Sequence, residues 1–290
     1  MYEVEDREHG RHVALKTLLH VAPSELVRFK HEFRVTSRLG HPNLLAMHEL
    51  FVAGDQAWLT MELVHGTDFL SWVRTDDKFD ESRLRAALRQ LAHGLAALHA
   101  FGILHRDLKP SNVLVREDGH VVVADFGLAR ELQGAATDSV SGTPAYMSPE
   151  QAAMLELGPP SDWYGVGVMI YEALTGHRPY DHLHGIALLM AKQIGCPEAP
   201  SVREPDVPAD LDRLCVDLLL RDPAARPTGA EVLRRLGRTR DPVPEVPATI
   251  AAELFVGRVP ELARLTDAFS RVRRDDAAVV AIVDGRSGTG

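Results

Sequence analysis

The sequence predicts an α+β fold, with a β-rich N-terminal part followed by a larger and mostly helical part. Three observations lead to this prediction. Up to about residue 62, apolar residues alternate with polar ones in short runs, which is typical of strands. From Phe79 onward, apolar residues recur every three or four positions, which is typical of helices. Two valine-rich runs, at 113–115 and 121–123, predict a hairpin inside the helical part.

The N-terminal part is expected to hold four strands and one helix. The first two strands lie on either side of Gly10, and the second of them covers about 11–16. Ser24 is a suitable N-cap for a helix over about 24–39. Two further strands are expected at about 44–53 and 56–62, joined by a turn at Gly54 and Asp55.

The helical part is expected to contain one long buried helix and several shorter ones. An apolar helix over 161–176 ends at Gly176, a favourable C-terminal cap. Shorter helices are expected near 184–194, 209–220 and 229–236. The long helix is predicted by leucines at helical spacing, namely Leu84, Leu88, Leu91, Leu95 and Leu98.

Composition restricts the class of protein. The 290 residues are 45% hydrophobic and 25% charged, which is ordinary for a globular protein with a buried core. A net charge of −9 argues against general nucleic-acid binding, because phosphate backbones attract basic surfaces. No apolar run approaches the roughly 18 residues of a membrane span. We therefore expect a cytoplasmic protein that has neither a nucleic acid nor a membrane as its partner.

Cysteines and clustered histidines give no sign of a disulfide framework or a metal centre. Cys196 and Cys215 are too few and too far apart for either, so both are expected to be buried or half-buried free thiols. His177, His182 and His184 lie in a loop without regular ligand spacing. We interpret these histidines as solvated side chains.

The stretch from His105 to Asn112 places an acid, a cation and an amide in one loop after the long helix. It reads His-Arg-Asp-Leu-Lys-Pro-Ser-Asn. A carboxylate at Asp107 can receive a hydroxyl proton, Lys109 can neutralise charge on a transferring phosphoryl group, and Asn112 can offer an oxygen to a metal ion. The alternative interpretation is a polar loop without a chemical task.

The predicted hairpin brings a second acid to this loop. Folding the chain about Asp118 places Asn112 opposite Ala124, one residue before Asp125. The amide oxygen and the carboxylate then arrive at the same end of the hairpin. Two hard oxygen ligands held together suit Mg²⁺ when nucleotide phosphates and water complete the coordination.

These motifs together resemble the eukaryotic-type (Hanks-type) serine/threonine protein kinases that bacteria also contain. The pattern H-R-D-L-K-P-x-N ends as in the Ser/Thr branch of that family, and Asp125-Phe-Gly127 matches its D-F-G motif. The resemblance implies a bilobal fold, with a small lobe over about 1–62 and a large lobe over about 66–236. It also implies ATP and Mg²⁺ as cofactors and protein Ser/Thr hydroxyls as substrates.

The resemblance assigns nucleotide-binding roles to residues of the small lobe. Val13-Ala-Leu-Lys16 is similar to the strand whose lysine grips the phosphates, and Glu32 stands where the family has the glutamate that orients this lysine. Glu62 and Val64 occupy the hinge whose backbone contacts adenine. Asp68 either meets the ribose or caps the helix that follows it.

The resemblance also covers the segment between Asp125 and Glu150. Gly142 to Glu150 is similar to the end of a kinase activation segment, with Ser148 where the family usually has alanine. Glu150 is expected to pair with Arg226, and Asp162 to brace the backbone of the loop that carries Asp107. Arg106 offers a cation to a phosphate, and autophosphorylation is expected at Thr137, Ser139 or Ser141.

Both ends of the sequence depart from a complete kinase pattern. The glycine-rich loop and the first strand of the small lobe have no counterpart, so we expect an N-terminally truncated kinase. A proline-rich linker is expected over 237–253. Residues 254–290 resemble the start of a P-loop NTPase domain of the AAA/STAND kind that stops before the lysine of its motif.

Two other functions remain open at this stage. A catalytically impaired, pseudokinase-like scaffold that controls an attached ATPase is favoured by the absent glycine-rich loop, whereas the complete set of catalytic residues favours the enzyme. A small-molecule phosphotransferase is disfavoured, because Lys109-Pro110 and Pro149-Glu150 suit protein substrates.

Overall fold

The computed structural model divides the chain into two compact units, Met1–Val243 and Pro244–Gly290. The structure describes residues 1–18, 30, 33–34, 36–37, 39–53, 56–75, 78–126 and 143–237. The expected NTPase segment and nearly all of the expected linker therefore lie outside the described residues. Among the described helices, none combines the length and the apolar character that crossing a bilayer requires.

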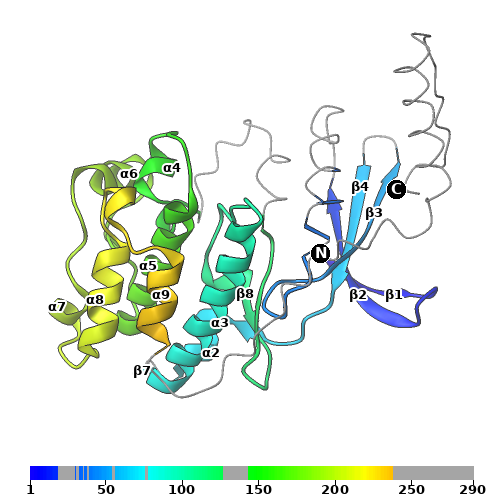
Figure 1. Ribbon diagram of the computed structural model, residues 1–290, viewed down its shortest axis with the longest axis horizontal. Coiled ribbons are helices and arrows are strands. Elements are labelled where there is room, and N and C mark those ends of the chain that lie inside the picture. The colour runs from blue at the N-terminus through cyan, green and yellow to red at the C-terminus, as the bar shows by residue number, and fades with distance from the viewer. Residues whose placement is uncertain are drawn as a thin grey trace, which may run out of the picture. The chain divides into compact units, whose positions relative to one another are not determined.

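Four antiparallel strands form the N-terminal sheet, in the order β1-β2-β4-β3 (Figure 1). They are β1 (Tyr2–Asp6), β2 (Arg11–Leu18), β3 (Met47–Ala53) and β4 (Gln56–Glu62). Every second side chain of β4 is buried, as the period of a strand requires. The four predicted strands are confirmed. β3 begins three residues later than predicted, because Leu44 instead forms a bridge with Val123.

The helix predicted over 24–39 falls largely on residues outside the description. Lys30, Phe33, Arg34 and Thr36 are described and are helical. Glu32 is among the residues outside the description.

Short elements connect the sheet to the helical part. They are β5 (Thr67–Asp68), α2 (Phe69–Val73), β6 (Arg74–Thr75) and β7 (Lys78–Phe79). The Asp68 carboxylate accepts hydrogen bonds from the backbone N–H groups of Leu70 and Ser71 and so caps α2. Of the two roles expected for Asp68, the cap is therefore observed.

The long helix α3 (Glu81–Ala100) is capped by Asp80 and leads to the stretch from His105 to Asn112. Its five predicted leucines are at most 1% exposed. After the 3-10 turn η1 (Pro110–Asn112), β8 (Val113–Val115) and β9 (Val121–Val123) form the predicted hairpin. Val113 pairs with Val123, and the Ala124 N–H donates to the Asn112 carbonyl over 2.8 Å. The register inferred from the sequence is confirmed.

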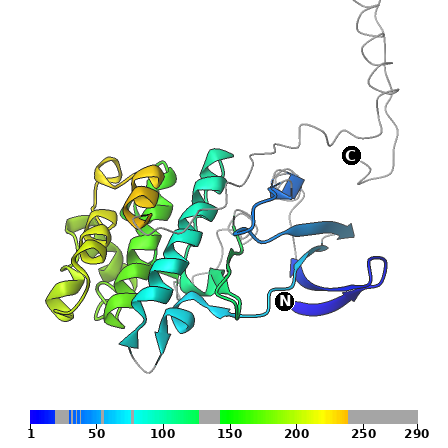
Figure 2. The ribbon, with the colours of Figure 1, turned by 60° about the horizontal axis from the view of Figure 1, so that its bottom comes forward.

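The C-terminal part of this unit is helical, and α5 (Pro159–Thr175) lies at its centre. Fourteen of the seventeen residues of α5 are buried, and Gly176 ends the helix with a φ of 74°. Figures 1 and 2 show α3, α5, α8 (Ala209–Leu218) and α9 (Gly229–Leu236) lying side by side. The described helices after the hairpin are η2 (Thr143–Ala145), α4 (Pro149–Ala152), α5 (Pro159–Thr175), α6 (Gly185–Ile194), α7 (Pro200–Arg203), α8 (Ala209–Leu218), η3 (Pro223–Ala225) and α9 (Gly229–Leu236).

The cysteines and two of the clustered histidines differ in how exposed they are. Both cysteines are free, but Cys196 is exposed and only Cys215 is buried, so the expectation of two sheltered thiols is wrong for Cys196. The reason is that Cys196 follows the end of α6, whereas Cys215 lies on the buried face of α8. The side chains of His177 and His182 are 61% and 68% exposed and lie near Asp181.

Candidate active site

The loop that carries Asp107 is held in place by a buried carboxylate on α5. Asp162 is 2% exposed and accepts hydrogen bonds from the backbone N–H groups of His105 and Arg106, each over 2.8 Å. The Nε2 atom of His99 lies 2.8 Å from the same carboxylate. Arg106 has a φ of 66°, a left-handed conformation that an arginine adopts only when its surroundings impose it. The bracing role expected of Asp162 is confirmed.

Close packing reinforces these hydrogen bonds. A Cβ atom added to Gly165 on α5 would lie 3.2 Å from the Cβ atom of Leu108. The glycine thus lets the loop pack directly against the helix. Leu108 is 4% exposed, so the residue next to Asp107 is anchored in the core.

His105 connects this loop to the end of the hairpin. It is 2% exposed, and burial lowers the pKa of its imidazole, so the neutral ring is favoured. Nε2 donates to the carbonyl of Ala124 over 3.0 Å. The loop with Asp107 and the residue before Asp125 are therefore joined through one buried ring.

The three polar residues predicted to act together in this loop form one hydrogen-bonded cluster. Lys109 Nζ donates to Asp107 Oδ2 over 2.8 Å. Asn112 Nδ2 donates to the Asp107 carbonyl over 2.7 Å and to Asp107 Oδ2 over 3.2 Å. The side chains of Asp107 and Lys109 are 24% and 28% exposed, so both can be reached from solvent. Since its nitrogen is used in these bonds, the amide of Asn112 offers its oxygen for other contacts.

Asp125 follows the hairpin in a strained conformation and pairs with Lys16. Its φ is 57°, and the next residue, Phe126, is fully buried. Lys16 Nζ lies 2.6 Å from Asp125 Oδ1, across 109 residues of sequence. The pairing expected between Lys16 and Glu32 lies outside the described residues, and so does Gly127.

The residues predicted to face adenine lie at the end of β4. The N–H of Glu62 donates to the carbonyl of Ala46 over 2.9 Å, and Glu62 is paired with Val13 of β2. The Glu62 side chain forms an ion pair with Arg116, which follows β8. Val64 is half-buried and packs against the core.

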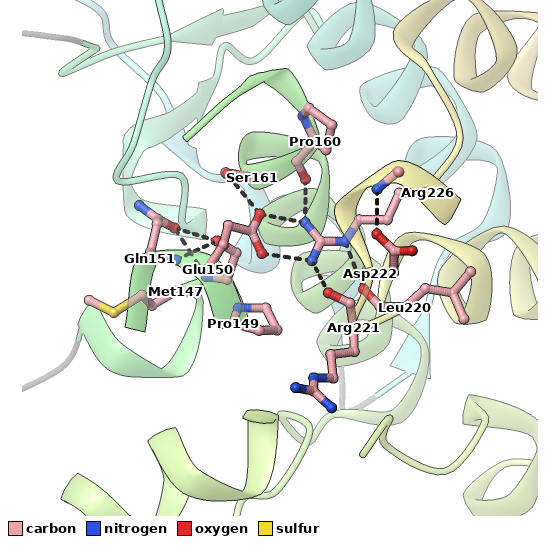
Figure 3. A network of polar contacts seen from close by, with 12 residues as sticks. Met147, Pro149, Glu150, Gln151, Pro160, Ser161, Leu220, Arg221, Asp222 and Arg226 are labelled. Carbon is pink, nitrogen blue, oxygen red and sulfur yellow. Dashed lines mark hydrogen bonds and ion pairs between the residues drawn. The ribbon is translucent and has the colours of Figure 1, made fainter. Parts of the chain in front are cut away.

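The predicted pair of Glu150 and Arg226 is present and buried. The two guanidinium NH groups of Arg226 donate to the two carboxylate oxygens over 2.6 and 2.8 Å (Figure 3). Arg226 also donates to the carbonyls of Pro160, Leu220 and Arg221. Burial raises the pKa of Glu150, but the bonds from Arg226 and Ser161 outweigh it and leave that pKa below its ordinary value.

Ser148 has a structural task that sequence reasoning did not assign to it. It is fully buried and caps α4 in a capping box with Gln151. Gln151 Nε2 also donates to the carbonyl of Arg106 over 2.8 Å. The start of α4 is thereby linked to the loop that carries Asp107.

Sequence reasoning also missed Lys192 on α6. Its side chain is 1% exposed and binds backbone carbonyls of the segment before α4. Two signals could have drawn attention to it. Lysine is scarce in this chain, and Lys192 is the only charged residue in the run from Gly185 to Ile194.

Comparisons with known proteins agree with this geometry. The family model described as a protein kinase domain matches residues 1–236. Serine/threonine-protein kinase PknA of Mycobacterium tuberculosis is 34% identical over 237 residues, which cover 78% of this chain and 54% of the relative. PknL of Mycobacterium bovis is 36% identical over 233 residues, covering 78% and 58%. Kinase pkn3 of Myxococcus xanthus is 34% identical over 241 residues, covering 77% and 44%.

The chain therefore spans about half the length of the curated relatives that it matches. The family match extends over the sheet, the loop that carries Asp107 and the helices up to α9. The chain belongs to the protein kinase domain family.

Proposed function

We propose that this chain transfers the γ-phosphoryl group of ATP to serine and threonine hydroxyls of protein substrates. One observation carries the proposal, namely the cluster in which Lys109 and Asn112 both contact Asp107. The matched relatives are named serine/threonine-protein kinases, which supports the same reaction class. Nothing in the described residues favours the scaffold alternative over this one.

Each residue of the site has a distinct part in the proposed reaction. Asp107 orients the substrate hydroxyl and receives its proton. Lys109, whose ammonium lies 2.8 Å from that carboxylate, neutralises negative charge on the phosphoryl group in transfer. Lys16 binds nucleotide phosphates once its ion pair with Asp125 opens, and the backbone around Glu62 and Val64 receives adenine.

The donors at the end of the hairpin fit a magnesium ion. The Asn112 amide and the Asp125 carboxylate both present hard oxygen atoms, which Mg²⁺ prefers. Bound there with ATP, the ion would neutralise phosphate charge during transfer. We propose Asn112 and Asp125 as the metal ligands.

The decisive experiment measures transfer of labelled phosphate from ATP to a generic protein substrate such as casein. Asp107→Asn should lower kcat by about 10²- to 10⁴-fold, because it removes the proton acceptor. Asp206→Asn, at an exposed position far along the chain, is the matched control and should retain activity. Equal activity in the Asp107→Asn variant and the wild type would rule out the proposed role of Asp107.

Three further parts of the proposal concern regulation, context and cell location. We propose autophosphorylation at Thr137, Ser139 or Ser141, which lie outside the described residues. Mass spectrometry after incubation with ATP and Mg²⁺ should find phosphate there, and its absence would refute this part.

We also propose that 254–290 begin a P-loop NTPase domain, and that the protein acts in the cytoplasm, where ATP is available.

A further inference from the structure

Lys192 is a buried lysine whose ammonium group contacts three backbone carbonyls. It lies near the C-terminal end of α6 and is 1% exposed. Its Nζ atom donates to the carbonyls of Pro144, Ala145 and Met147 over 2.8, 2.7 and 2.7 Å. An ammonium group has three N–H donors, so these three acceptors use all of them.

Holding this charge inside the protein is unfavourable unless its contacts compensate. Burial and the nearby Arg178 lower the pKa of Lys192 to about 7. The three carbonyl oxygens act in the opposite direction because they favour the ammonium form, as does the face of Tyr164, whose ring centre lies 5.4 Å from Nζ. An apolar side chain would fill the same space without the desolvation cost. The lysine therefore serves to fix the backbone that it contacts.

The fixed backbone borders the catalytic aspartate. Tyr146 and Met147 line a small hollow together with Arg106 and Asp107. Tyr146 donates to Glu172 of α5 over 2.5 Å, so the side chain in the middle of this segment is held independently. The segment therefore lies beside the carboxylate to which a substrate polypeptide would bring its hydroxyl.

Another part of the same segment lines a larger hollow. Pro144 and Ala145 line a space of about 310 Å³ together with residues that precede and begin α6, among them Arg178 and Leu188. In Figure 1, α6 lies beside α4, and Gln193 of α6 also donates to the carbonyl of Pro149 over 2.5 Å. Helix α6 thus holds the segment at 144, 145, 147 and 149.

We propose that Lys192 is a positioning residue for the protein substrate, which holds segment 144–147 in the shape that receives the polypeptide next to the reacting hydroxyl. This inference rests on the proposed kinase function. Because Lys192 contacts neither the nucleotide-binding residues nor Asp107 in the hydrogen bonds described above, its effect should appear in substrate binding rather than in the use of ATP.

Steady-state kinetics with one peptide substrate test the proposal. Lys192→Met should raise the KM for the peptide by about tenfold or more, with kcat and the KM for ATP changed much less, because binding is weakened equally in ground and transition states. Lys192→Gln keeps two N–H donors and should give an intermediate KM. Lys78→Met removes an exposed lysine and should match the wild type. An unchanged peptide KM in both Lys192 variants would overturn the proposal.

A second measurement does not depend on phosphate transfer. Chymotrypsin cuts after tyrosine, so the rate of cleavage after Tyr146, followed by mass spectrometry, reports how firmly the segment is held. This rate should rise in Lys192→Met relative to the wild type and to Lys78→Met. If neither the wild type nor any variant phosphorylates a protein, the proposed function fails. The cleavage rates still decide whether Lys192 holds the segment. Should Lys192→Met not fold, Lys192→Gln decides both measurements.

Discussion

Lys16 and Asp125, which form an ion pair, are proposed to bind the two oppositely charged parts of magnesium ATP. Lys16 would bind the phosphates, and Asp125 would bind the metal ion. Their contact of 2.6 Å neutralises both, and their side chains are 22% and 30% exposed, so a ligand can reach them. A nucleotide offers phosphate to the lysine and its magnesium ion to the carboxylate. Binding then replaces the internal ion pair by two contacts with the ligand. The Mg²⁺ dependence of ATP affinity therefore measures how much the Asp125 carboxylate contributes to binding the metal.

Asp125→Asn should remove most of the effect of Mg²⁺ on ATP affinity. In the wild type, Mg²⁺ should strengthen ATP binding, whereas in the variant the gain should fall by about tenfold, or about 1.4 kcal/mol. Affinity for ATP without Mg²⁺ should not fall, because Lys16 loses its internal partner and can contact phosphate. Isothermal titration calorimetry with and without Mg²⁺ measures both. Asp118→Asn, in the hairpin turn, is the control, and an undiminished Mg²⁺ effect in Asp125→Asn would show that another group binds the metal.

At the scale of single elements, the short helix α4 depends on its buried cap. Ser148→Ala removes the hydroxyl that accepts from Gln151 N, and should destabilise the domain by about 0.5–2 kcal/mol. Urea unfolding at neutral pH measures the change. Ser82→Ala is the matched control, because Ser82 lies exposed in the first turn of α3, where alanine is a good helix former. Equal stability of Ser148→Ala and the wild type would mean that the cap contributes nothing.

The hairpin of β8 and β9 and the Asp68 cap of α2 show which elements a sequence can predict. The register of β8 and β9 follows from counting residues about one turn, because every contact in it is local. Asp68 as a cap follows from the same kind of local pattern. The bonds from Gln151 to Arg106 and from Lys192 to segment 144–147 join residues 45 to 48 positions apart, and no periodicity links them. A lysine in a helical run is ordinarily taken as solvent-exposed, so its burial became evident only from the fold.

At the scale of the whole domain, one ion pair connects distant parts of the helical region. Glu150 lies in the first turn of α4, and Arg226 follows η3, 76 residues later. The side chain of Arg226 is fully buried and that of Glu150 is 5% exposed, so neither charge can turn to water when its partner is lost. Tyr164 adds its ring face 5.0 Å from the guanidinium carbon. Loss of the carboxylate would leave an uncompensated buried charge.

Glu150→Gln should destabilise the domain by about 3–5 kcal/mol at pH 7. Because the pKa of Glu150 is lowered in the folded state, its carboxylate stabilises the fold fully above the unfolded value near 4.5, and this contribution is lost as the pH falls through the folded pKa. The difference between wild type and variant in urea unfolding should therefore shrink between pH 5 and 3. Glu231→Gln, which breaks a solvent-screened pair with Arg234 and Arg235, should matter far less. A difference that stayed constant down to pH 3 would show that the fold does not lower the pKa of Glu150.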